Sequence, residues 1–308
     1  MSTNSDRISS ASDLRRMEYF IAVAEELHFG RAAQRLHMSQ PPLSTQIQRL
    51  EQEVGARLLR RTKRSVELTA AGEVFLQEAR ATVRQAARAA ERARAAARGE
   101  LGRLDLGVID AALYGVAPQI IRRFTERYPG VELTVSERRG DEQVALIAAG
   151  KLHAGFVHPP VRQPAVAVEV LHTEPFVLAM PESHPLAARE RVSLAQVCAH
   201  PLIQAPRSVN PEGHDSMIAI CRERGLRPNI AREASPKQTI IALVAAGLGA
   251  SVVPAVLARH PHPGVVYRPI EDGGFGISTA LAWRRQNPEP TVLALLDVAR
   301  ELRDAATP

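Results

Sequence analysis

The fold is decided by the stretch Ser39-Gln-Pro-Pro-Leu-Ser-Thr-Gln-Ile-Gln-Arg-Leu-Glu51. Ser39 is a favoured N-cap residue, whose hydroxyl can accept a hydrogen bond from a free backbone N–H of the first turn. The two prolines that follow fall in that turn, where a missing N–H costs little. Apolar residues then recur at the spacing of one helical face, at Leu43, Ile47, Leu50 and Val54. We therefore expect an amphipathic helix that begins at Ser39 and ends near Gly55.

Two helical patterns precede this helix. The first has apolar residues at helical spacing, at Phe20, Ala24 and Leu27. The second is a short helix after Gly30, and residues 37–38 form the turn before Ser39. A helix, a short turn and a second amphipathic helix make a helix-turn-helix.

A basic stretch follows the helix-turn-helix. Residues 60–64 are Arg-Arg-Thr-Lys-Arg, and residues 66–68 alternate apolar and polar side chains as a strand does. A basic turn that leads into a strand is what a wing requires. We therefore expect a winged helix-turn-helix at residues 14–72.

Residues 73–98 form an Ala- and Arg-rich run without Gly or Pro. Small apolar residues repeat in it at alternating steps of three and four, at Leu76, Ala79, Val83, Ala86, Ala90, Ala93 and Ala97. That spacing is a coiled-coil seam, and alanines let two helices approach closely. An Ala-rich run also shows Ala in many other registers, so a solvated single helix is the alternative. We expect a linker helix at residues 73–100 that pairs two copies of the chain.

From residue 104 onward, strand-like and helical runs alternate, which predicts an α/β fold. The expected strands lie near residues 104–109, 131–135, 154–157, 167–180, 202–204, 229–233, 250–253, 264–270 and 277–283. The expected helices lie near residues 114–128, 141–149, 211–224, 236–246 and 289–303. Crossover helices between strands predict mostly parallel sheets. Ligands of such folds bind beyond the carboxyl ends of the strands.

Composition and charge restrict the function. The net charge of +6 falls entirely on residues 1–103, which favours a polyanion such as nucleic acid as the partner of that part, although ordinary surface chemistry also explains it. The two cysteines fit neither a disulfide framework nor a metal site. Residues 1–13 are polar and are expected to be a disordered lead-in. No apolar run reaches the ~18 residues of a membrane span, so we expect a cytoplasmic protein without a membrane partner.

The motifs resemble those of the LysR-type transcriptional regulators. Residues 17–26, 29–36, 39–51 and 58–72 agree with that family in identity and spacing. Further family motifs follow in the usual order, among them Tyr128-Pro129, His184-Pro-Leu186 and Val253-Pro254. The resemblance covers about residues 14–305.

The resemblance implies a winged helix-turn-helix, a long linker helix and an effector domain at residues 101–308 that is like periplasmic binding proteins. This domain has two α/β lobes, lobe I at about residues 104–172 and 273–308 and lobe II at about residues 173–272, with a small-molecule effector in the cleft between them. Promoter DNA, RNA polymerase and further copies of the chain, usually as a homotetramer, are the implied partners. The output is activation or repression of transcription.

The exposed start of the second helix is where bases of the major groove are read, and the basic residues near the wing suit phosphates. The expected DNA-binding residues are Arg31, Ser39, Gln40, Pro41, Pro42, Ser44, Thr45, Gln48, Arg61, Lys63 and Arg64. Thr45 departs from the family pattern, in which an Arg is frequent at this position, so the preferred half-site differs.

The effector site is expected near the ends of the first three strands of the α/β part and on the facing lobe. The expected residues are Asp110, Ala111, Ala112, Arg138, Arg139, His158, Pro206, Arg207, Ser208 and Gln238. Three of them are arginines, which suggests an anionic effector such as a carboxylate. Relatives that bind carboxylates often carry a Ser or Thr near Ala111 and Gly140, and both hydroxyls are missing here.

Other functions are less compatible with the sequence. No nucleophile-elbow pattern and no metal-ligand spacing occurs among the ten histidines and two cysteines, so we expect neither catalysis nor a metal or other cofactor. A DNA-binding protein without an effector is the alternative. A solute-binding protein is a weaker one, because it leaves residues 14–68 without a role.

Overall fold

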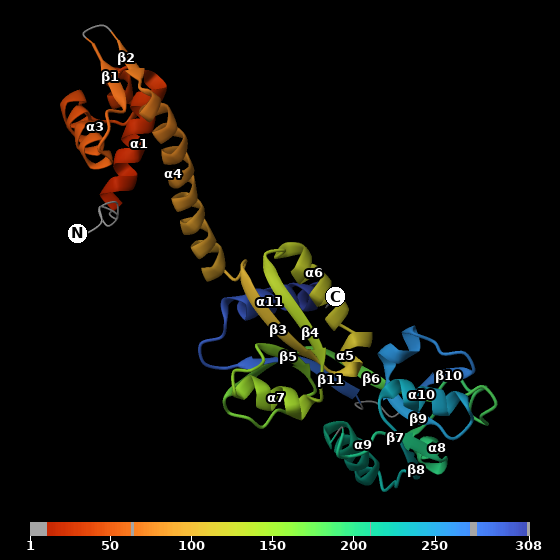
Figure 1. Cartoon of the computed structure of the whole chain (residues 1–308). Helices are drawn as coiled ribbons and strands as arrows, with labels where there is room; N and C mark the ends of the chain where they lie inside the picture. Colours follow the sequence, from red (N-terminus) through yellow and green to blue (C-terminus); the bar gives the residue numbers. More distant parts are fainter. Residues whose placement is uncertain (1–10, 63–64, 210, 272–275, 307–308) are drawn as a thin grey trace. The chain divides into compact units, whose positions relative to one another are not determined.

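The computed structural model describes residues 11–62, 65–209, 211–271 and 276–306 (Figure 1). The chain forms two compact units, whose boundary falls between Arg94 and Ala95. Helix α1 begins at Ala11, inside the stretch expected to be a disordered lead-in, and the first ten residues of that stretch lie outside the described part.

The first unit contains three helices around one core, α1 (Ala11–Glu26), α2 (Phe29–Arg35) and α3 (Gln40–Val54). The predicted inner face of α3 is confirmed, since Leu43, Ile47 and Leu50 are buried against Phe20 and its neighbours. Ser39 is the N-cap residue, but its side chain makes no capping hydrogen bond, which corrects our expectation. Gly55 ends the helix in the left-handed conformation, at a φ of 75°.

A two-stranded hairpin follows α3. Strands β1 (Leu59–Arg61) and β2 (Val66–Leu68) pair antiparallel, whereas the sequence predicted only the second strand. Helix α4 (Ala70–Ala97) starts directly after the hairpin and has the length of a linker helix. Gly72 of α4 is buried against the Leu58 backbone, so the helix begins in close contact with the hairpin.

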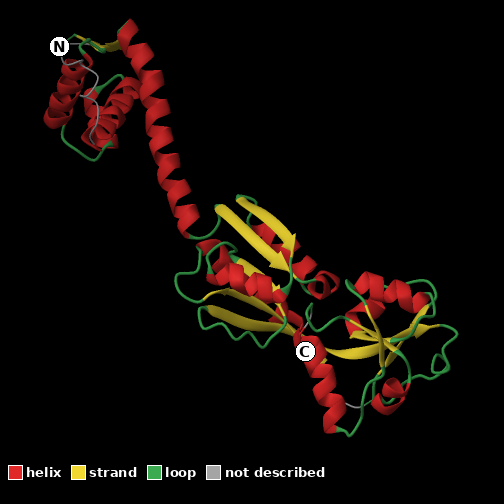
Figure 2. Ribbon diagram, turned by 60° about the horizontal axis from the view of Figure 1, so that its bottom comes forward, coloured by secondary structure: helices red, strands yellow, loops and turns green. Residues whose placement is uncertain are grey.

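The second unit has a mixed sheet with the strand order β10-β6-β11-β5-β3-β4, and β9 also pairs with β6. Its strands are β3 (Gly102–Val108), β4 (Val131–Glu137), β5 (Ala154–Val157), β6 (Val166–Pro181), β9 (Ser251–Pro254), β10 (Val265–Pro269) and β11 (Gly276–Arg284). Strands β7 (Leu202–Gln204) and β8 (Ile230–Glu233) form a separate parallel pair. Figure 2 shows the strands gathered in two groups with helices around them.

Strand β6 connects the two groups. Its residues 166–175 pair with β11, and its residues 176–181 pair with β9 and β10. Among the paired strands of the described part, only β3 with β4, β3 with β5, and β7 with β8 are parallel. The expectation of mostly parallel sheets was therefore wrong, because β6 and β11 run antiparallel to their neighbours.

Helices cover the strands of the second unit. They are α5 (Asp110–Tyr114), α6 (Ala117–Arg127), α7 (Gly140–Ala148), α8 (Leu194–Ala199), α9 (Pro211–Glu223), α10 (Lys237–Ala245), the 3-10 helix η2 (Ala255–Arg259) and α11 (Pro290–Ala306). The helix predicted near residues 114–128 corresponds to α6, and α5, α8 and η2 were not predicted. Cys198 and Cys221 are free, buried thiols with 3.5 Å between their sulfur atoms.

Candidate functional site

Helix α3, labelled in Figure 1, has exposed side chains along its first three turns. These side chains are those of Gln40, Pro41, Pro42, Thr45, Gln48 and Arg49. Ser44 is half-buried, and its hydroxyl accepts a hydrogen bond from Arg61 Nη1 over 3.1 Å. The Thr45 hydroxyl donates to the Pro41 carbonyl within the same helix, over 3.2 Å, and keeps acceptor capacity on its outer side.

Glu51 joins α3 to the hairpin. Its Oε1 accepts hydrogen bonds from the backbone N–H groups of Leu58 and Leu59, over 2.9 and 3.0 Å. Its Oε2 accepts from Arg61 Nη2 over 3.2 Å. The Arg61 guanidinium also lies 4.6 Å from the centre of the Phe29 ring. These contacts fix the angle between α3 and the hairpin, and sequence reasoning missed Glu51 because its partners are backbone groups.

The basic residues that we predicted to contact DNA phosphates do not share one environment. Arg61 points into the unit, which does not favour the phosphate contact that we predicted for it. Arg31 is exposed, and it bonds the Glu26 carboxylate over 3.3 Å and the Glu26 carbonyl. Ser39 is exposed beside Gln40. The predicted contacts Lys63 and Arg64 lie outside the described residues.

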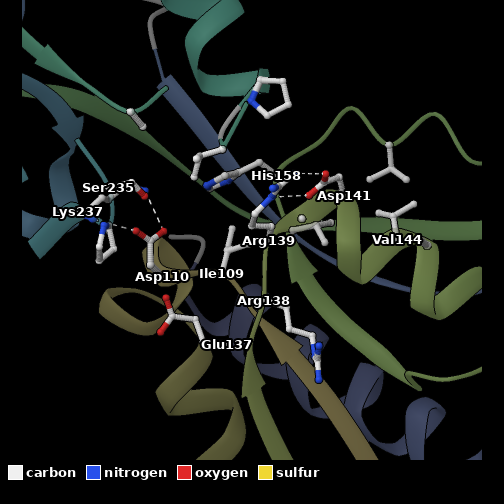
Figure 3. Close-up of a pocket in the computed structure, with 18 of the residues that line it drawn as sticks. Ile109, Asp110, Glu137, Arg138, Arg139, Asp141, Val144, His158, Ser235 and Lys237 are labelled. Carbon is white, nitrogen blue, oxygen red and sulfur yellow. Dashed lines mark hydrogen bonds and ion pairs between the residues drawn. The ribbon is translucent and has the colours of Figure 1, made fainter. Parts of the chain in front are cut away.

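The second unit contains a cavity of about 460 Å³ beyond the carboxyl ends of β3, β4 and β5 (Figure 3). The end of β3 contributes Asp110, the end of β4 contributes residues 137–141, and the end of β5 contributes His158. The opposite wall comes from the start of α10 and from Ala205 and Val209. The volume falls in the range of small-molecule sites, and the position is the one expected for an α/β fold.

Asp110 and Lys237 form an ion pair on the cavity wall. Lys237 Nζ donates to Asp110 Oδ1 over 2.9 Å, and Figure 3 shows the two side chains joined by a dashed line. Both side chains are largely buried, at 20% and 14% exposure. Burial acts to raise the pKa of Asp110, but the Lys237 charge and hydrogen bonds outweigh it and hold that pKa below its ordinary value. Asp110 is therefore ionised.

His158 is held by the backbone of β11. Its Nδ1 lies 2.9 Å from the Ser278 carbonyl, so this nitrogen carries the proton and donates. Burial lowers the pKa of His158 to about 4, against the opposing effect of the Ser278 hydrogen bond. The ring is thus neutral at pH 7, and its buried Nε2 is an acceptor without a partner among the described residues.

The predicted cavity residues divide into two groups. Asp110, Arg138, Arg139 and His158 line the cavity. The predicted residues that do not line it are Ala111, Ala112, Pro206, Arg207, Ser208 and Gln238.

The side chains outside the cavity have other positions. Ala111 and Ala112 are buried in the core, and Gln238 is exposed one residue after Lys237. Arg207 is exposed and pairs with Asp215 over 2.7 Å. Lys237, which sequence reasoning missed, is the cation closest to the predicted acid, and its 127-residue separation from Asp110 leaves no local signal.

Within the described ranges, His, Cys, Asp and Glu side chains do not gather in groups of three or more that would hold a metal ion. Among the helices of the same residues, none has both the length and the apolar character that a membrane crossing requires.

Comparisons with known proteins find matches to both units of the chain. Residues 14–73 match the family described as "Bacterial regulatory helix-turn-helix protein, lysR family", and residues 97–304 match "LysR substrate binding domain". The transcriptional regulator AlsR of Bacillus subtilis is 39% identical over 93% of this chain and 95% of its own length.

Solved structures are similar over most of the chain. CbnR, a LysR family transcriptional regulator, is 33% identical with a TM-score of 0.85, over 93% of this chain and 99% of CbnR. Full-length CbnR complexed with its target DNA is similar with 32% identity and a TM-score of 0.81, over 94% and 99% of the two chains. The chain therefore belongs to the LysR-type DNA-binding transcriptional regulators, which combine a helix-turn-helix with an effector-binding domain.

Proposed function

We propose that the chain reads promoter DNA with the exposed edge of α3 and responds to a small anionic effector in the cavity of the second unit. The observation that carries the first part is the division of α3 into a buried apolar face and an exposed edge that begins at its N-terminus. Residues at the N-terminus of a recognition helix reach base edges in the major groove. Bound beside a promoter, the regulator would contact RNA polymerase as a further partner.

Gln40 and Gln48 are two side chains of this edge with base-specific chemistry. A glutamine amide can bond adenine through both its donor and its acceptor, and each good pair of this kind discriminates by about 1–3 kcal/mol. Thr45 offers a hydroxyl and a methyl group in place of the frequent Arg. The half-site that it favours is therefore read by contact with a thymine methyl or a single hydrogen bond rather than by a charged pair with guanine.

Replacement of Gln48 tests the base-reading role. Gln48→Ala should weaken binding to the operator about tenfold and leave binding to unrelated DNA nearly unchanged, because a base contact is lost but no phosphate contact is. Fluorescence anisotropy with both DNAs at one salt concentration measures this. Gln85→Ala, which removes an exposed glutamine of α4, is the matched control. Equal losses on both DNAs would contradict base reading by Gln48.

A small excess of cations in the lining supports an anionic effector. Four cations contribute to the cavity, Arg138, Arg139, Arg162 and Lys237, against three carboxylates, those of Asp110, Glu137 and Asp141. A ligand changes the DNA complex only if it binds one conformation of the protein more tightly than another. Footprint length with a panel of organic acids therefore tests the ligand response. An unchanged footprint across the whole panel favours a DNA-binding protein without an effector.

Self-association through α4 completes the proposal. The seam residues Ala90, Ala93 and Ala97 are exposed in the single chain, and the alanines permit close approach of a second helix. Two recognition helices held in one dimer would read two half-sites, and two dimers would make the tetramer that is usual in the family.

A further inference from the structure

The Asp110 carboxylate is held by three donors, two of which come from α10. Ala111 N donates to Oδ1 over 2.7 Å, within α5 itself. Lys237 donates twice, from Nζ to Oδ1 over 2.9 Å and from its backbone N to Oδ2 over 3.4 Å. Asp110 lies at the start of α5 and Lys237 at the start of α10, so this one carboxylate bridges the two walls of the cavity.

The α10 side of this bridge has the chemistry of an anion site. The helix has nine residues, and its first backbone N–H groups carry the partial positive charge of the helix N-terminus. The Lys237 ammonium adds a full charge at the same place. A carboxylate on these donors is the expected occupant, and here the chain supplies the carboxylate itself.

His158 gives an indication, independent of the helix N-terminus, that the site is shaped for a ligand. His158 lines the same cavity, and its buried Nε2 has no hydrogen-bond partner among the described side chains and backbone groups. Lys237 also borders a second, smaller cavity of about 50 Å³, whose lining includes Phe176, Met217 and Val252. Lys237 therefore borders open space in two cavities, of which only the larger has the volume of a small-molecule site.

We propose that Asp110 is a tethered ligand: its carboxylate occupies the anion site at Lys237 that a carboxylate of the effector takes over. This proposal rests on the proposed function, because it concerns the same cavity. When the effector carboxylate displaces Asp110 from Lys237, the direct contact between the two cavity walls is replaced by a contact through the effector. Asp110 therefore sets the affinity for anions, since every anionic effector has to compete with it.

Restoring a missing carboxylate from solution tests the proposal. Asp110→Ala empties the anion site of the full-length chain, and sodium formate can refill it, with sodium chloride as the control for ionic strength. The melting temperature of Asp110→Ala should rise saturably in formate, by about 2–4 °C beyond the chloride response. The wild-type chain should show no excess rise, because Asp110 already fills the site.

Two further variants make the result specific. Asp110→Ala combined with Lys237→Gln should lose the formate response, since the receiving ammonium is gone. Asp304→Ala removes an exposed carboxylate that pairs with Arg303 and should respond as the wild type does. If formate acts equally on all of these chains, no anion site exists at Lys237 and the proposal fails.

A milder substitution at the same position covers the case in which Asp110→Ala does not fold. Asp110→Asn keeps the shape of the side chain and removes its charge, so calorimetry should show tighter formate binding than for the wild type, by about tenfold. Equal or weaker binding overturns the proposal. Neither assay contains DNA, so a footprint that no effector changes would contradict the ligand response while leaving the anion site at Lys237 intact.

Discussion

His158 links folding of the second unit to pH. The imidazole pKa falls from 6.5 to about 4 on folding, so between these values the unfolded chain binds a proton that the folded chain does not. The contribution of neutral His158 to the unfolding free energy is therefore complete above pH 6.5. It is lost as the pH falls toward 4, by about 3 kcal/mol in total. When the pH falls from 6.5 to 4, the unfolding free energy of the His158→Gln chain should therefore decrease less than that of the wild type.

Urea unfolding at several pH values measures the effect of His158. Trp283 is the only tryptophan and packs against the core of the second unit, so its fluorescence reports this unit within the full-length chain. The difference in unfolding free energy between wild type and variant should shrink as the pH falls from 6.5 to 4. A constant difference would mean that His158 does not titrate in this range.

The residues that sequence reasoning missed share a physical cause. Lys237 and Glu51 act through partners that are distant in sequence or lie in the backbone, and neither leaves a periodic pattern. Gln238 was predicted instead of Lys237, but successive residues of a helix point about 100° apart, so only one of the two faces the cavity. Asp110 and His158 were predicted because each directly follows a strand whose end is clear from the sequence.

At the scale of elements, the contact between α4 and the hairpin has no room for a side chain at Gly72. A Cβ on Gly72 would lie 2.0 Å from the Leu58 carbonyl oxygen, a backbone atom that cannot move aside. Gly72→Ala should destabilise the first unit by about 1–3 kcal/mol through overpacking and should loosen the start of α4. Circular dichroism in urea should show an earlier transition for this unit.

Two observations control the Gly72 experiment. The transition of the second unit, followed by Trp283 fluorescence, should stay in place. Gly140→Ala adds a methyl group in α7 where a Cβ meets nothing within 4 Å, so it should cause no such loss. A Gly72→Ala chain as stable as the wild type would show that the hairpin and α4 can separate freely.

Element prediction succeeded where the pattern was long. Helix α3 has an apolar face, two prolines in its first turn and a terminal glycine, and all of these agree on its bounds. Strand β1 has three residues, two of them arginines, and such a strand cannot be distinguished from a basic loop by alternation. Its pairing with β2 depends on Glu51 and on the turn, which are tertiary features.

At the scale of the whole molecule, the seam of α4 should decide whether the chain pairs. Ala90→Glu places one carboxylate from each of two paired chains in the proposed seam. Because these like charges repel each other and lose their hydration there, dimers or larger assemblies should dissociate to monomers at micromolar concentration. Sedimentation velocity measures this change. Ala81→Glu alters an exposed alanine on the opposite face of α4 and should leave the assembly unchanged. An unaltered assembly with Ala90→Glu would exclude this seam.

The topology of the second unit was predicted only in part. Alternating strands and helices correctly indicated an α/β fold, and β3, β4 and β5 are parallel as expected. The direction of β6 and β11 could not be read from their sequences, because buried strands have continuous apolar patterns in either direction. Their pairing joins residues more than 100 positions apart.

Strand β6 has a mechanical consequence. One continuous backbone is paired with β11 on one side of Pro175 and with β9 and β10 beyond it. A widening of the cavity that moves β9 and β10 away from β11 would therefore twist this strand. Proline has no N–H to donate, so twisting at Pro175 sacrifices fewer ladder hydrogen bonds than twisting at its neighbours. The occupancy of a small cavity would thus be converted into rotation at one position of the backbone.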